Sequence, residues 1–294
     1  MSADAGDHDL NWHRAVPDLR RPILIAAFEG WNDAGDAATI ATRQLVERLD
    51  ATPLVDIDPE HYFDFSATRP IVHLDEDRRR SISWPANQLL AARVPTATRD
   101  VVILIGLEPQ LQWRRFCRQV LEVARIVDAS TIVTLGALLT DVPHTRPVQV
   151  YGATEDPELQ QRLDLEPSAY EGPTGIVGAL TTEAVQAGFP TATFWASVPS
   201  YVPGAPSPKA ALELVHHVCE VLGTTVFVTD LEIAAADYER QVDELVAEDD
   251  DTAEYVRELE AAWDDEEDDV EPLDDDPELL VAEVEEFLRD PDLG

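Results

Sequence analysis

The stretch Pro22–Asp36, PILIAAFEGWNDAGD, decides the fold of this chain. It opens with an unbroken apolar run, Ile23–Phe28, which is typical of a strand buried on both faces of a sheet that helices cover. A polar turn follows, and Ala34–Leu49 then places apolar side chains at helical spacing on one face. Strand, glycine-containing turn and helix together predict the opening of an α/β domain.

The same pattern occurs further along the chain. The segment Asp100–Leu107 is a second apolar strand, which ends in Glu108-Pro109 and precedes a helix over Leu111–Val127. A third apolar strand, Thr131–Leu135, ends at Gly136. Repeated strand–turn–helix units predict a layered α/β domain with a largely parallel sheet. Two shorter strands, 71–74 and 81–84, flank the cluster Arg78-Arg79-Arg80, which we interpret as a solvated turn.

Polar residues gather where these strands end. In open α/β sheets the carboxyl edge is the usual ligand crevice, and the loop 141–150 could join it. Carboxylates beside a histidine and an arginine can perform acid–base chemistry or hold an anion. The candidate catalytic residues are Glu29, Asp33, Glu108 and His144, and the candidate ligand-binding residues are Asn32, Arg146 and Lys209.

Each candidate also has a structural interpretation. Asp33 or Asn32 can cap the helix that follows, and capping is the more frequent role of such residues. Arg146 can pair with a carboxylate to anchor its loop, and His144 can be a hydrogen-bonded structural histidine. Lys209, the only lysine, stands at a helix start where a solvated side chain is ordinary. The tryptophans at 31, 113 and 195 suit a core or an interface.

Several kinds of site are not predicted. The turn GWNDAGD lacks the Gly-Lys-Ser/Thr ending of a phosphate-binding loop and the glycine spacing of a dinucleotide loop. No nucleophile elbow and no metal-binding spacing occurs, so we expect neither a cofactor nor a metal. Neither Cys117 nor Cys219 lies at a helix start that would lower its pKa.

The charge is unevenly distributed. The chain carries a net charge of −38 over 294 residues. Residues 229–294 hold 29 Asp and Glu against three Arg, a net of −26, which leaves −12 for the remaining 228 residues. This field disfavours nucleic acid and anionic membrane as partners. Two cysteines without a spacing motif, no export signal and no apolar run long enough to span a bilayer predict a cytoplasmic protein.

The composition also divides the chain. We expect a flexible N-terminus over 1–20 and an α/β domain over 21–228. An acidic helical hairpin over 229–263 follows, because apolar residues form helical stripes there. An acidic linker over 264–276 and a C-terminal amphipathic helix and tail over 277–294 complete the chain.

Six segments of the chain carry a resemblance to a known family. FEGWNDAGDAA from Phe28 resembles the signature of the proteasome assembly chaperone family of the second-subunit type, in its actinobacterial branch. Further matches follow in the same order, and together they cover about residues 20 to 225. They are GLEPQLQWRRF at 106–116, DVPHTRPV at 141–148, YEGPTGIVGAL at 170–180, FWASVPSYV at 194–202 and PSPKAALEL at 206–214.

The resemblance implies a fold and a function. The implied fold is a three-layer α/β/α sandwich like that of purine nucleoside phosphorylases and related hydrolases, with a helical C-terminal addition. The implied function is a non-catalytic binding or assembly protein that forms a homo-oligomer, with a trimer favoured, and holds proteasome subunits. The alternative is a small-molecule enzyme at the crevice described above. It would be a nucleoside-type hydrolase or phosphorylase, or an ATP-dependent ligase.

Overall fold

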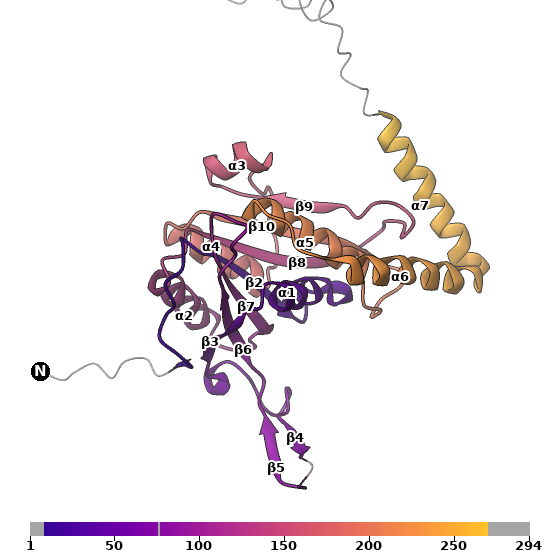
Figure 1. Cartoon of the computed structure of the whole chain (residues 1–294). Coiled ribbons are helices and arrows are strands. Elements are labelled where there is room, and N and C mark those ends of the chain that lie inside the picture. The colour runs from indigo at the N-terminus through magenta and orange to yellow at the C-terminus, as the bar shows by residue number, and fades with distance from the viewer. Residues whose placement is uncertain (1–8, 76, 270–294) are drawn as a thin grey trace, which may run out of the picture.

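The computed structural model describes residues 9–75 and 77–269 and contains a mixed eight-stranded sheet (Figure 1). The strand order is β1-β3-β6-β7-β2-β8-β10-β9. The four strands β7, β2, β8 and β10 are parallel, whereas β1, β3 and β6 on one side and β9 on the other pair antiparallel. The strands are β1 Leu10–Trp12, β2 Ile23–Glu29, β3 Thr52–Ile57, β6 Asn87–Ala92, β7 Val101–Leu107, β8 Thr131–Thr140, β9 Val150–Ala153 and β10 Thr191–Pro199.

The first predicted strand lies at the centre of the sheet. β2 pairs in parallel with β7 on one side and with β8 on the other, so that Ile23 is opposite both Val101 and Thr131. Its residues from Ile23 to Phe28 are fully buried, as the unbroken apolar run predicts. The three apolar strands therefore lie side by side.

Helices cover both faces of this sheet. Side chains of Ile23, Ile25 and Ala27 pack in one core with α1 and α5, whereas Leu24, Ala26 and Phe28 pack in the other with α2 and α4. This alternation follows from the two-residue period of a strand. The predicted three-layer α/β/α sandwich is confirmed. The helices are α1 Ala37–Arg48, α2 Trp113–Ile126, α3 Pro157–Leu163, α4 Ile176–Gln186, α5 Pro208–Leu222, α6 Thr229–Ala247 and α7 Asp250–Asp269, with short 3-10 turns η1 Ala34–Asp36 and η2 Pro59–His61.

Parts of the structure differ from the expected boundaries. β1 lies inside the segment expected to be flexible, where it pairs with β3 at the sheet edge. The sheet also contains β6, which the sequence patterns did not single out. At the other end, α7 continues to Asp269 and so includes the first six residues of the expected linker. The expected C-terminal helix over 277–294 lies outside the described residues.

Two strands lie outside the main sheet. β4 Ile71–Leu74 and β5 Arg80–Ser83 pair only with each other and form an antiparallel hairpin that projects from the body (Figure 1). All eight of their residues are exposed. Among the described residues, no helix is both long and apolar enough to cross a membrane.

Candidate functional site

The acidic ends of β2 and β7 adjoin at the carboxyl edge of the sheet. The backbone N–H of Glu108 donates to the carbonyl oxygen of Glu29 over 2.9 Å. Their side chains nevertheless diverge. The Glu29 carboxylate pairs with Arg43 of α1, whereas Glu108 Oε1 accepts hydrogen bonds from Asn32 Nδ2 at 2.8 Å and from the backbone N–H of Ile176 at 3.0 Å. Because α1 and α4 cover opposite faces, the two carboxylates point to different helix layers.

Asp33 takes the capping role rather than facing a crevice. Its carboxylate accepts hydrogen bonds from the backbone N–H of Ala38 at 2.6 Å and from the hydroxyl of Thr39 at 2.5 Å. It thereby satisfies free donors at the start of α1 from across the 3-10 turn. Burial raises the pKa of Asp33 from 3.8 to about 6, against the lowering effect of these hydrogen bonds.

Asn32 is fully buried and connects three elements. Its carbonyl oxygen accepts from Ala137 N–H of β8 at 2.8 Å, and its Nδ2 donates to Glu108. Its Oδ1 accepts no hydrogen bond from the described residues. A Cβ at Gly175 would come within 2.1 Å of that oxygen, so the start of α4 must have glycine here to approach Asn32.

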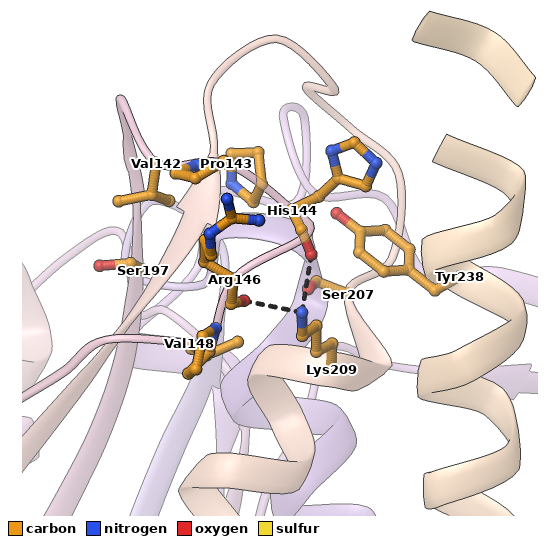
Figure 2. Close-up of a pocket in the computed structure, with 11 residues that line it drawn as sticks. Val142, Pro143, His144, Arg146, Val148, Ser197, Ser207, Lys209 and Tyr238 are labelled. Carbon is orange, nitrogen blue, oxygen red and sulfur yellow. Dashed lines mark hydrogen bonds between the residues drawn. The ribbon is translucent and has the colours of Figure 1, made fainter. Parts of the chain in front are cut away.

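The remaining candidates form a separate cluster after β8 (Figure 2). Lys209 Nζ donates to the carbonyl oxygens of His144 and Arg146, each at 2.7 Å, and pairs with Glu239 of α6. Figure 2 shows the lysine between these two carbonyls. The guanidinium of Arg146 forms two hydrogen bonds with Asp264 of α7, both of 2.7 Å. These contacts join the 141–148 loop to α5, α6 and α7.

The histidine of this cluster has both ring nitrogens engaged. The Tyr201 hydroxyl accepts from the backbone N–H of His144 and lies 2.8 Å from its Nδ1. Burial raises the pKa of Tyr201. The other ring nitrogen, His144 Nε2, lies 3.0 Å from the Asp243 carboxylate of α6. The adjoining cavity measures about 10 Å³, room for roughly one water and not for a substrate.

The seven candidate residues therefore fall into two groups with different surroundings. Glu29, Asn32, Asp33 and Glu108 hold helix starts and strand ends at the sheet edge, and His144, Arg146 and Lys209 fasten the C-terminal helices. The described part of the chain contains no group of three His, Cys, Asp or Glu arranged to hold a metal. Burial raises the pKa of the Cys117 thiol to about 12 and also raises that of Cys219.

One hollow at the sheet edge was not recognised from the sequence. It encloses about 220 Å³ and is lined by Trp31, Glu108, Trp113, Pro173, Thr174 and Gly175. Trp31 is 69% exposed, although the sequence suggested a core or interface residue. A tryptophan in the turn immediately after a buried strand, between Gly30 and Asn32, is the signal that could have indicated this position.

The comparisons agree on one family. The family model described as PAC2 family matches residues 27–246. A proteasome-assembly chaperone homologue of Mycobacterium tuberculosis is 44% identical, with a TM-score of 0.73 over 80% of this chain and 99% of that chain. A PAC2 family protein from Streptomyces avermitilis is 41% identical, with the same TM-score and the same coverage of both chains.

A Mycobacterium tuberculosis protein of unknown function is 27% identical, with a TM-score of 0.80 over 91% of this chain and 95% of that chain. None of the curated proteins matches the chain. The 44% and 41% identical relatives come from actinobacteria, in agreement with the branch that the sequence segments indicated. The chain belongs to the PAC2 family.

Proposed function

We propose that this chain is a non-catalytic protein-binding module of the proteasome-assembly-chaperone type, which self-associates and holds proteasome subunits. Family membership and the relative described as a proteasome-assembly chaperone homologue support this proposal. The candidate catalytic side chains also have structural partners: Glu29 has Arg43, Asp33 has the start of α1, Glu108 has the start of α4 and His144 has Tyr201 and Asp243.

The observation that carries the proposal is the projecting hairpin β4–β5. Val72 is directly opposite Ile82, and Leu74 is opposite Arg80, so these four side chains share one face. Trp84 follows Ile82 at alternate spacing. Val72, Leu74 and Ile82 are 53%, 59% and 53% exposed. A hairpin of two strands is only marginally stable alone, and an exposed apolar face of this kind marks an interaction surface.

We assign a second copy of this chain as the occupant of that face. Residues 69–84 contain four Arg against three acidic residues, whereas α6 and α7 with their connection, residues 229–269, contain 19 acidic residues against two Arg. The hairpin of one copy therefore complements the acidic helices of another. A contact between two different surfaces closes into a ring when the rotation permits, and a trimer is the simplest such ring.

Sedimentation equilibrium tests self-association. We expect wild-type protein to sediment as a trimer. The double variant Val72→Thr/Ile82→Thr keeps β-branched residues but loses apolar surface. Its trimer should therefore dissociate at a protein concentration about tenfold higher, or more, than that of the wild type. The matched control His73→Thr/Ser81→Thr alters the opposite face and should keep the wild-type mass. An apolar-face variant with unchanged mass would contradict the assignment.

Copurification with the proteasome core particle tests the partner. We expect the tagged full chain to recover core-particle subunits well above an untagged control. Recovery at background level would count against the assembly role. A thermal shift with nucleosides, nucleotides or phosphate would instead favour a small-molecule enzyme, because a ligand that binds only the folded state raises its melting temperature.

A further inference from the structure

We propose that the hollow between Trp31, Trp113 and Glu108 is a binding site for an organic cation, specifically the guanidinium group of an arginine on a protein partner. The proposal rests on the proposed function only in taking the partner to be a protein. The site itself depends on contacts at the sheet edge, which are independent of the hairpin and of the acidic helices.

The carboxylate in this hollow is oriented in advance. Both of the hydrogen bonds that hold Glu108, from Asn32 Nδ2 and from the N–H of Ile176, end on Oε1. Within residues 9–75 and 77–269, no donor reaches Oε2, which lies on the side of Gly30, next to Trp31 in the chain. One oxygen thus fixes the side chain, and the other is available to a ligand.

The carboxylate of Glu108 also determines the sign of the charge that a ligand in this hollow must carry. An anion at the start of α4 would compete with Glu108, which already accepts the N–H of Ile176, and would be repelled by its charge. Residues 1–228 alone carry a net charge of −12, so the charge of the body also favours a cation over an anion. A cation at Oε2 would complete an ion pair without disturbing the hydrogen bonds of Oε1.

The aromatic walls decide the kind of cation. Trp31 is 69% exposed, whereas tryptophan side chains are largely buried on average. Trp113 Nε1 donates to the carbonyl oxygen of Pro109, and this bond orients its ring. A planar guanidinium stacks on indole faces while it donates to a carboxylate, which an ammonium cannot do in the same way.

The size of the hollow agrees with this choice. Pockets for drug-sized ligands enclose roughly 300–1,000 Å³. The volume of about 220 Å³ here suits a single side-chain terminus better than a whole nucleoside. Pro173 and Gly175 line it beside the aromatic rings, so the stem of an arginine side chain would meet apolar surface.

Calorimetric titration with a short peptide tests the site. The probe is acetyl-Gly-Arg-Gly-amide, and the comparison is the same peptide with citrulline, which keeps the shape of arginine but has no charge. We expect full-length wild-type protein to bind the arginine peptide at least about tenfold more tightly, with weakening by salt. Equal affinities for the two peptides would overturn the proposal.

Variants of the full chain locate the binding. We expect Trp31→Leu and Glu108→Gln each to reduce affinity by about fivefold or more, whereas Phe227→Leu, at an exposed aromatic residue outside the hollow and the hairpin, should leave it unchanged. The glutamine of Glu108→Gln can still accept the two hydrogen bonds at Oε1, so this variant should keep its fold. The Trp31→Leu variant should keep its fold as well, because Trp31 is exposed. Wild-type affinity in both would overturn the assignment.

The same samples separate this proposal from the proposed function. If the sedimentation mass and recovery of the core particle are as expected but the arginine peptide does not bind, only the cation site is wrong. If the peptide binds and both variants weaken binding as expected while no subunit is recovered, the site stands and the assembly role fails.

Discussion

At the scale of single residues, Asp33 makes the clearest prediction. Its folded pKa of about 6 is higher than the 3.8 of an ordinary aspartate, so the folded chain binds the proton more tightly than the unfolded chain. The stability that protonated Asp33 contributes to the folded state is therefore fully present below about pH 4 and is lost as the pH rises through 6. The shift corresponds to about 2 to 3 kcal/mol of unfolding free energy.

The variant Asp33→Asn isolates this contribution. We expect the free energy of unfolding of the wild type, relative to that of the variant, to fall by about 2 kcal/mol between about pH 4 and pH 7. Urea titrations of both proteins at several pH values measure the difference, and subtraction removes the many other carboxylates that the chains share. Parallel pH profiles would show that Asp33 titrates normally.

Residue identity alone could predict part of this site and not the rest. The capping role of Asp33 followed from its place before a helix, because capping depends on local hydrogen bonds. The separation of Glu29 from Glu108 did not follow, because it depends on which side of the sheet each side chain faces and on distant partners, Arg43 and Ile176. The exposure of Trp31 likewise depends on what the rest of the chain leaves uncovered.

At the scale of elements, the predictable strands were those with strong local patterns. The central strand β2 and its neighbours β7 and β8 are continuous apolar runs. By contrast, β6 begins with Asn87-Gln88 and β1 has three residues, so neither presents a pattern of its own. Both owe their conformation to pairing with neighbours: β6 lies between β3 and β7, and β1 pairs with β3.

Lys209 tests how the C-terminal helices are attached to the body. Lys209→Met keeps the apolar stem but removes the donor from two carbonyl oxygens and from Glu239 of α6. We expect the free energy of unfolding to fall by about 1 to 3 kcal/mol and the backbone amides of α6 to exchange faster. Hydrogen exchange followed by mass spectrometry over Thr229–Ala247 measures the exchange rate.

Arg240→Met provides the matched control for this experiment. Arg240 lies on the exposed side of the same helix, and among the residues that the structure describes it pairs only within that helix, with Asp237 and Glu244. Exposed pairs of this kind contribute about 0.3 to 0.5 kcal/mol, so exchange over α6 should change little. If both variants accelerated exchange equally, Lys209 would have no special role in attaching the helix.

At the scale of the whole molecule, the two cores indicate where the folded body ends. Within residues 9–75 and 77–269, their last buried member is Leu231 of α6, and every other buried member lies before residue 223. α6 nevertheless packs on the body through Ala235, Tyr238 and Val242, which are buried. The expected boundary between 228 and 229 remains a prediction, and the contacts of α6 make truncation the direct way to test it.

Two truncations compare the parts of the C-terminal segment. Removal of Asp264–Gly294 takes away one ion-pair partner of Arg146, Asp264, and leaves Glu260, and it removes none of the described members of either core. We expect the remaining chain to melt cooperatively, within a few degrees of the full chain, because 1 kcal/mol shifts the melting temperature of a domain of this size by about 2–4 °C.

Removal of Thr229–Gly294 exposes the apolar surface of α5 that α6 covers and deletes Leu231 from the core. We therefore expect this shorter chain to melt at a clearly lower temperature while it keeps a single cooperative transition, since both helix layers and the sheet remain. Differential scanning calorimetry of the two truncated chains measures the melting temperature and the cooperativity of each. Loss of the cooperative transition already in the longer truncation product would place the segment after residue 263 within the folding unit, and the α/β body would not be independent of it.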